Sequence, residues 1–167
     1  TYVTESGIAP YVSYATSFQP VIGATFDGTP FAPTQGKQWE GGVKYDARGL
    51  GDDIKLFATA AVFRIDQTNV LTTDTRAGAP LFAQIQEGKV KSEGAELEVV
   101  GRFHEKLSVN ASYSFTNARV ARGDNAGARL AAQPRHKASL LVDYTHDVGA
   151  LAGFGGVLYA SYNGGAT

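Results

Sequence analysis

The sequence contains neither cysteine nor methionine among its 167 residues. Without cysteine the chain has no disulfide framework and no cysteine-ligated metal site. Its net charge of −1 lacks the basic excess that marks a nucleic-acid-binding surface, so we expect no nucleic-acid partner. The missing methionine predicts a processed chain or a piece of a longer one, and no signal peptide is visible at residues 1–3.

Long hydrophobic runs are also absent. The longest, Leu56–Phe63, is interrupted by Thr59 and falls far short of the roughly 18 to 20 residues of a transmembrane helix. No helical periodicity is present. The chain is rich in glycine (20), phenylalanine (9) and tyrosine (8), a composition typical of many-stranded β proteins. We therefore expect any membrane crossing to use strands.

The clearest pattern lies in residues 88–103, where residues 94–103 alternate between two series. The apolar series consists of Ala95, Leu97, Val99, Gly101 and Phe103. The other series includes Glu96, Glu98 and Arg102. Successive side chains of a strand point to opposite faces, so this strand has one apolar and one charged face. Such a strand suits a membrane barrel with a watery lumen.

The same alternation predicts seven strands along the chain. Their predicted ranges are 8–18, 37–47, 53–67, 88–103, 107–120, 134–145 and 154–163. Long connections (19–35, 68–87 and 122–133) alternate with short ones (48–52, 104–106 and 146–153). This alternation is typical of outer-membrane barrels, which have short periplasmic turns and long outer loops. The fold class is all-β: an antiparallel transmembrane β-barrel segment of about seven up-and-down strands.

One strand, 53–67, has an ambiguous orientation. One of its faces contains Phe57 and Phe63, and the other contains Arg64 and Asp66. Arginine facing lipid costs roughly 2 to 4 kcal/mol near the bilayer midplane, so we predict that Arg64 and Asp66 face the lumen. Lys55 then lies on the lipid side, at the start of the strand, where it snorkels to the interface.

Aromatic residues near the strand ends predict the interfacial girdles of a membrane barrel. They are Tyr14, Trp39, Tyr45, Phe63, Tyr113, Phe115, Tyr144 and Tyr159. Seven strands cannot close a bacterial barrel of even strand number, and an open edge is not tolerated in lipid. We therefore expect the chain to be part of a larger barrel.

Five segments, in order, resemble motifs of TonB-dependent siderophore receptors. They are residues 11–20 (YVSYATSFQP), 36–45 (GKQWEGGVKY), 61–70 (AVFRIDQTNV), 88–98 (GKVKSEGAELE) and 134–140 (PRHKASL). The resemblance implies a 22-stranded outer-membrane barrel around a plug, of which residues 1–167 form one part without the plug, the TonB box or the final strand. It also implies uptake of a ferric siderophore as the transported ligand, energised by the TonB complex, with outer-membrane lipid around the barrel and no covalently bound cofactor.

Two constellations suggest other chemistry. Glu96 and Glu98 share a face about 7 Å apart, within the roughly 6.5 to 9.5 Å range of inverting glycosidases. A solvated lumen wall explains them better, so we expect no enzyme activity and no catalytic residues. The histidines His104, His136 and His146 fall at turns and strand starts on opposite sides, which predicts no shared metal site.

The long loops are the predicted place of ligand selection. Aromatic side chains can flank a flat chelate, and arginine can pair with an anionic one. The candidate ligand-binding residues are Phe26, Phe31, Arg76, Phe82 and Gln84. Two alternatives to a receptor remain open at this point. One is a soluble β-sandwich or lipocalin-like small-molecule binder, and the other is an enzyme built on an outer-membrane barrel.

Overall fold

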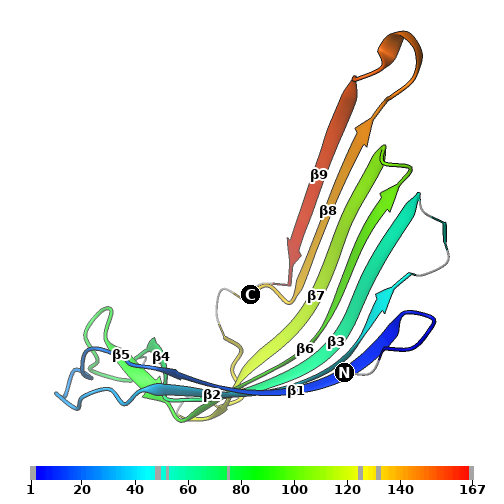
Figure 1. The fold of residues 1–167 in the computed structure, drawn as a ribbon. Helices are drawn as coiled ribbons and strands as arrows, with labels where there is room; N and C mark the ends of the chain where they lie inside the picture. Colours follow the sequence, from blue (N-terminus) through cyan, green and yellow to red (C-terminus); the bar gives the residue numbers. More distant parts are fainter. Residues whose placement is uncertain are drawn as a thin grey trace.

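The chain forms one curved antiparallel sheet in a computed structural model, which describes residues 3–47, 50–51, 53–74, 76–123, 126–130 and 133–165 (Figure 1). Seven strands make up this sheet in the order β1-β2-β3-β6-β7-β8-β9. Their bounds are β1 Ile8–Gln19, β2 Thr34–Asp46, β3 Ile54–Thr68, β6 Lys89–Phe103, β7 Leu107–Arg122, β8 His136–Thr145 and β9 Gly155–Gly164. Several are far longer than the five or six residues usual in globular proteins.

The seven predicted strands are confirmed, with ends that differ by up to three residues. Two predicted connections contain more structure than expected. Residues 68–87 include a hairpin of β4 (Val70–Thr73) and β5 (Gln84–Glu87). The turn after β8 includes a 3₁₀ helix, η1 (Gly149–Leu151). The predicted connections 48–52 and 122–133 lie partly outside the described residues. Among the described helices, none is long and apolar enough to cross a membrane.

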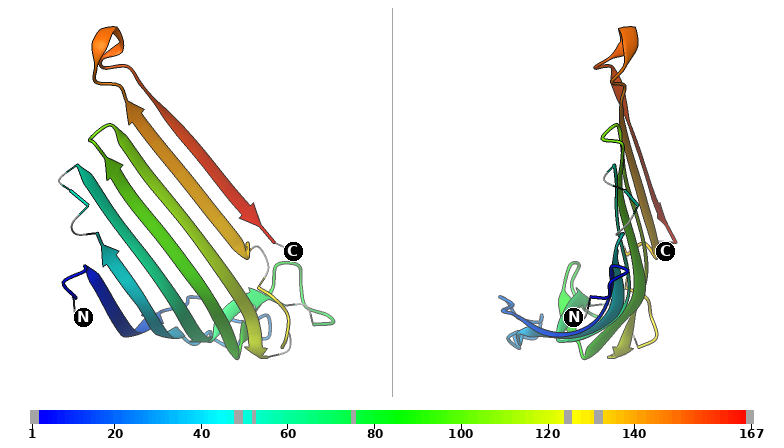
Figure 2. Two further views of the ribbon diagram at one scale, coloured as in Figure 1. Left: turned by 90° about the vertical axis from the view of Figure 1, so that its right-hand side faces the viewer. Right: turned by 45° about the vertical axis from the view of Figure 1, so that its right-hand side comes forward.

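The sheet is a single layer, as the nearly edge-on view shows (Figure 2). Its apolar face is exposed: Leu97 is 46% accessible and Val62 is 63% accessible. Within the described residues only five apolar side chains are buried. A β-sandwich or a lipocalin would cover Leu97 and Leu140 with protein, so the structure does not support that alternative. The apolar face instead suits a lipid environment.

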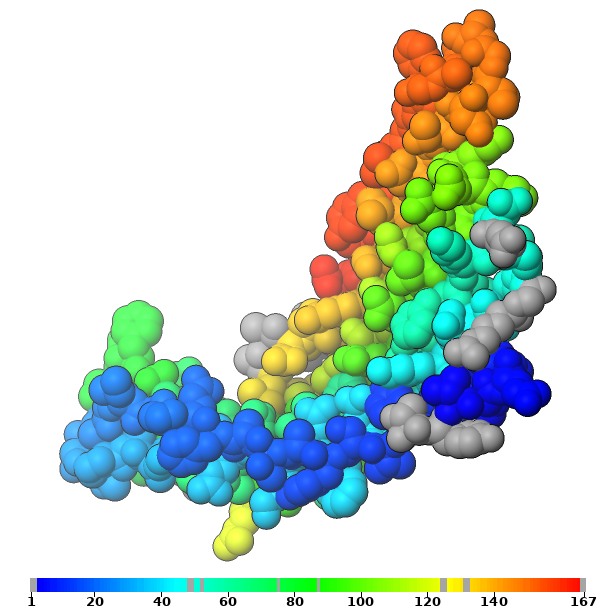
Figure 3. Space-filling model, viewed as in Figure 1, coloured from blue at the N-terminus to red at the C-terminus, as the bar shows by residue number. Residues whose placement is uncertain are grey.

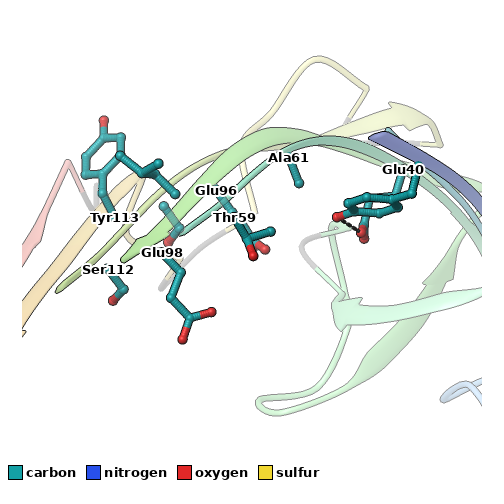
Figure 4. Close-up of a pocket in the computed structure, with 10 residues that line it drawn as sticks. Glu40, Thr59, Ala61, Glu96, Glu98, Ser112 and Tyr113 are labelled. Atoms are coloured by element: carbon teal, nitrogen blue, oxygen red, sulfur yellow. Dashed lines mark hydrogen bonds between the residues drawn. The ribbon is translucent and has the colours of Figure 1, made fainter. Parts of the chain in front are cut away.

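The register defines two faces by the residues that pair across the sheet. The concave face carries Glu40, Thr59, Glu96, Glu98 and Ser112, and the convex face carries Val43, Ala60, Leu97, Tyr113 and Ala138. Figure 4 shows Thr59, Glu96, Glu98 and Ser112 on the hollow side of the sheet and Tyr113 on the other side. The predicted split of β6 into an apolar and a charged face is therefore confirmed.

The predicted orientation of β3 is wrong. Arg64 faces Trp39 and Glu93 across the sheet, and Asp66 faces Lys91, so both lie on the convex face. The expected cost of charge in lipid does not apply, because these residues lie at the end of β3 that leads into a long connection, beyond the apolar band. Lys55 pairs with Arg102 on the concave face and does not snorkel along lipid.

A close approach on the concave face helps to fix this orientation. The Phe63 ring lies over Gly94, where an added Cβ would come within 2.6 Å of the ring. A glycine at this position therefore makes room for a large aromatic side chain that turns away from lipid.

The predicted girdles need a related correction. Phe63 and Tyr159 lie on the concave face, because Phe63 pairs with Glu40 and Tyr159 pairs with Leu141. The others lie on the convex face. Tyr14, Trp39 and Phe115 occupy the half of their strands toward the long connections, Tyr113 lies near the middle of β7, and Tyr45 and Tyr144 occupy the opposite half.

Candidate ligand-binding site at the outer loops

The long connections all emerge at one end of the sheet, and the short turns lie at the other (Figure 1). In outer-membrane barrels the long loops face the cell exterior. We call this the outer end. At the outer end, the β4–β5 hairpin bends over the concave side of the sheet.

The β4–β5 hairpin borders a hollow of about 720 Å³. Three of the predicted ligand-binding residues line it: Arg76, Phe82 and Gln84. Its other lining residues are Thr73, Asp74, Ala79, Pro80 and Leu81. Phe82 is 89% accessible and Leu81 is 87% accessible, so much of the wall is exposed apolar surface. The hollow has the size of a small-molecule site.

Arg76 is held in place by Asp74, whose side chain is fully buried. The guanidinium donates from Nε to Oδ1 at 2.9 Å and from Nη2 to Oδ2 at 2.6 Å, a two-point contact. The backbone N–H of Arg76 also donates to the carboxylate, at 3.0 Å. The side-chain hydrogen bond from Arg76 lowers the pKa of Asp74 below its ordinary value. Asp74 therefore stays ionised and fixes the arginine at the edge of the hollow.

Phe26, a fourth predicted residue, lies in the first long connection. The Arg76 guanidinium carbon is 5.3 Å from the centre of the Phe26 ring, close enough for a cation–π contact. Phe26 is half exposed. Arg76 thus joins two connections that are distant in sequence.

Side-chain hydrogen bonds from the hairpin strengthen the same junction. Gln86 accepts a hydrogen bond from the backbone N–H of Ala32 at 2.8 Å and donates one to its carbonyl at 2.6 Å. Asn69, which adopts a left-handed backbone (φ 58°), donates to the Pro33 carbonyl at 2.9 Å. In the space-filling view the first connection and the hairpin lie together at the outer end (Figure 3).

Phe31 is the predicted residue that lies apart from the hollow. Its ring packs within the first connection, where an added Cβ on Gly23 would come within 3.2 Å of it. Its backbone N–H donates to the Gly23 carbonyl at 3.0 Å. Phe31 therefore shapes the first connection and does not line the hollow.

Sequence reasoning missed Asp74, Asn69 and Gln86. The Asp-x-Arg spacing at residues 74–76 was an available signal, because a carboxylate two residues before an arginine can hold it through a local turn. Gln86 gave no such signal, since its partner Ala32 is 54 residues away.

A second hollow, of about 250 Å³, lies against the concave wall (Figure 4). Its lining includes Glu96 and Glu98 together with Glu40 and Tyr11. The Tyr11 hydroxyl donates to Glu40 Oε1 at 2.7 Å. The predicted carboxylate pair thus belongs to an open polar wall.

The three histidines do not converge. His136 begins β8 at the outer end, where its Nδ1 lies 2.8 Å from the Tyr113 hydroxyl. His104 and His146 follow β6 and β8 at the opposite end. Among the described residues, no group of three or more metal-ligating side chains is close enough to hold an ion.

Comparison with known proteins identifies the family. The model of the TonB-dependent receptor-like β-barrel matches residues 1–167. The chain is 34% identical over 154 residues to the ferrioxamine B receptor of Salmonella typhimurium strain SL1344, covering 91% of this chain and 21% of that protein. It is 35% identical over 153 residues to the ferrichrome outer membrane transporter/phage receptor of Escherichia coli strain K12, covering 91% of this chain and 20% of that protein.

The fold agrees with a solved receptor. The alcaligin outer membrane receptor FauA of Bordetella pertussis superposes with a TM-score of 0.64 and 27% identity, covering 95% of this chain and 27% of that one. The chain thus spans about a fifth of the length of the curated relatives it matches. Because the family model matches residues 1–167 and these two outer-membrane relatives align with 91% of the chain, the chain belongs to the TonB-dependent receptor β-barrels of the bacterial outer membrane.

Proposed function

We propose that the protein takes up ferric siderophores across the outer membrane, with energy supplied by the TonB complex. Residues 1–167 form part of the barrel wall, and other parts of a longer protein supply the plug and the remaining strands. Two features support this division: the chain matches about a fifth of its relatives, and β1 and β9 each pair on one side only within the described residues.

The observation that carries the proposal is the hollow at the outer end. It lies above the concave, polar side of the sheet, where a ligand enters before it passes into the barrel. Its aromatic and aliphatic side chains suit the organic frame of a chelate, and Gln84 and Arg76 offer hydrogen-bond donors to its oxygens. Iron arrives already wrapped in the chelator, so the protein needs no resident metal and no covalent cofactor.

Ligand selection is assigned to Phe26, Arg76, Phe82 and Gln84 at the hollow, with Phe31 shaping the first connection. Arg76 is engaged by Asp74, so it contributes a neutralised, oriented guanidinium and not a bare positive charge. This arrangement favours a neutral or weakly charged chelate. The named ligands of the relatives, ferrioxamine B and ferrichrome, are the first to test.

No catalytic role is assigned to Glu96 and Glu98. The relatives are named as receptors and transporters, and these carboxylates form part of a wide polar wall with Glu40. They keep the barrel interior hydrated, as in other water-filled barrels.

Uptake of radioactive iron by cells tests the proposal. The full-length receptor is expressed in a Gram-negative bacterial strain that lacks other siderophore receptors, and iron is supplied with ferrioxamine B or ferrichrome. We expect accumulation that disappears when TonB is deleted. Accumulation that persists without TonB would contradict the proposal, as would failure to take up any of a wide panel of siderophores.

The same assay tests the assigned residues. The double variant Arg76→Ala with Phe82→Ala is expected to lower siderophore affinity at least tenfold, since it removes the oriented Arg76 guanidinium and the exposed Phe82 ring from the lining of the hollow. Phe154→Ala is the matched control, because Phe154 is also exposed but follows β8 at the opposite end. Unchanged affinity in the double variant would remove the ligand-binding assignment and leave the transport function standing.

A further inference from the structure

We propose that a row of hydroxyl and amide side chains on the concave face of β7 guides the chelate through the barrel. The row, which we call the β7 track, consists of Ser108, Asn110, Ser112, Ser114 and Thr116. The proposal rests on the uptake function proposed above and adds the part of the wall that the moving ligand touches. The residues that line the outer hollow lie on a different segment.

Every member of the β7 track is polar and uncharged. Alternate positions put all five side chains on one face, with successive members about 7 Å apart. The track is about 27 Å long and, at a strand tilt of about 40°, covers about 21 Å of the membrane thickness. Among the described strands of the sheet, no other has five successive concave residues of this kind: β1 is interrupted by Ala15 and β6 by Glu98.

The β7 track is open to the interior of the barrel. None of its side chains is buried. Figure 4 shows Ser112 on the hollow side of the sheet, and Ser112 and Ser114 line the hollow of about 250 Å³ on the concave wall. The next two concave residues toward the outer end, Ala118 and Val120, are buried. Thr116 is therefore the outermost open position of the track.

The polar groups of the β7 track are available to a ligand. Within the described residues, Ser112 is the only member whose side chain has a hydrogen-bond partner: its Oγ lies 2.7 Å from Ser139 Oγ on β8. Ser139 pairs in turn with Ser161 on β9, so three serines about 5 Å apart widen the track sideways. A hydroxyl both donates and accepts, so each position can bind a carbonyl or an N–H group of an organic chelate.

Uncharged groups suit a ligand that must keep moving. A neutral hydrogen bond is about half as strong as a charge-assisted one, so each position holds the chelate only weakly. Passage through a pore needs several such sites in series, favourable enough for entry and weak enough for release. The charged neighbours, Glu98 beside Ser112 and Lys137 beside Ser114, are better suited to hold a fixed part of the protein. The β7 track also matches the neutral or weakly charged chelate that the outer hollow favours.

Substitutions of matched shape in the full-length receptor test the β7 track. Ser112→Val with Ser114→Val removes two hydroxyls, whereas Ser112→Thr with Ser114→Thr adds similar bulk and keeps both. With ferrioxamine B or ferrichrome, whichever the parent receptor transports, we expect the valine receptor to be at least about fivefold slower at saturating ligand, the equivalent of one neutral hydrogen bond. Equilibrium affinity in cells without TonB is expected to stay unchanged, and the threonine receptor is expected to keep the parent rate. Ser13→Val with Ser17→Val, which removes two hydroxyls from the concave face of β1, is the matched control and keeps the parent rate.

Photochemical labelling locates the moving ligand without reference to its rate. A transported chelate that carries a diazirine is irradiated in cells with and without TonB, and its adducts are mapped by mass spectrometry. We expect adducts at residues 108–116 only in cells with TonB, because only there does the ligand leave the outer hollow. Adducts at the hairpin, residues 70–87, are expected in both kinds of cell.

Three outcomes would overturn the proposal. The first is a parent rate in the valine receptor, or an equal loss of rate in the valine and threonine receptors. The second is labelling of β1, β2 or β3 by the moving chelate with none on β7. The third is a new sensitivity of the valine receptor to vancomycin, because such a leak would mean that the β7 track seals the plug and does not guide the ligand. All three are measured in a receptor whose parent form takes up the chelate, so a parent receptor that takes up none would instead contradict the proposed function itself.

Discussion

Leu97 and Glu98 are neighbours on β6, but they lie on opposite faces of one sheet. The convex face around Leu97 carries five successive rows of paired residues without Asp, Glu, Lys or Arg, and toward the long connections its charges begin at Arg64 and Glu93. The concave face around Glu98 carries charged and hydroxyl groups along its full length, with glycine and aromatic pairs such as Gly94 and Phe63. On the convex face, then, the position of a charge along the strand decides its cost, whereas on the concave face the space above the backbone is the main constraint.

The largest expected effect comes from placing a charge in the middle of the convex face. Leu97→Arg is expected to cost about 2 to 4 kcal/mol of folding stability, because the guanidinium would face the bilayer midplane. Ser112→Arg, one strand away on the concave face beside Glu98, is expected to cost close to nothing. Urea unfolding of the whole receptor in lipid vesicles measures both. Equal costs would show that the two faces do not differ as described.

Gly94→Ala tests the constraint on the concave face. A Cβ at this position would clash with the Phe115 carbonyl oxygen, and backbone cannot move aside cheaply. We expect a loss of about 1 to 3 kcal/mol by overpacking, measured by the same unfolding assay. Gly156→Ala is the control, since nothing lies within 4 Å of its added Cβ. A neutral Gly94→Ala would show that Phe63 and the strand relax without cost.

These two faces also show how far the sequence could predict the fold. Alternation in β6, β7 and β8 predicted both faces, because those strands have one clearly apolar series. It failed in β3, where both series are largely apolar and the cost of Arg64 in lipid was applied at a depth where it does not hold. The girdle prediction failed at Phe63 and Tyr159 because an aromatic ring can pack on the concave face, against a glycine in the case of Phe63.

The hollow at the outer end could be predicted from the sequence only in part. Loop position pointed to Arg76, Phe82 and Gln84, which the structure brings to one hollow. The hairpin strands β4 and β5 were missed because each has four residues, too few for a periodic signal. Gln86 was missed for a different reason: it acts on Ala32 across a distance in sequence that no local pattern reports.

The variant Asp74→Asn tests the hollow at the outer end separately from the stability of the sheet that supports it. Without the carboxylate, the two-point contact to Arg76 is lost and the junction with Phe26 loosens. We expect siderophore affinity to fall about tenfold, the equivalent of one charge-assisted hydrogen bond, with unfolding of the sheet unchanged. Asp147→Asn is the control, because that exposed carboxylate pairs with Lys106 at the opposite end. An affinity loss of similar size in the control would indicate a general effect of removing charge.

The smallest effect is expected from pH, and it is confined to the hairpin. The hydrogen bond from Arg76 lowers the pKa of Asp74 in the folded hairpin, so protons bind more tightly when the hairpin opens. The stabilisation is therefore complete at neutral pH and lost only as pH falls through the lowered pKa, below the ordinary carboxyl value of about 4. Amide hydrogen exchange of β4 and β5, corrected for the intrinsic pH dependence of exchange, should show constant protection from neutral pH to about pH 4 and faster opening below it. In Arg76→Gln the hairpin starts less protected and its protection falls nearer the ordinary carboxyl pKa, whereas exchange in β6 and β7 does not change. A loss of protection that begins well above pH 4 in the parent receptor would mean that Asp74 is not the titrating group, and the hairpin would then be held chiefly by Gln86 and Asn69, neither of which titrates.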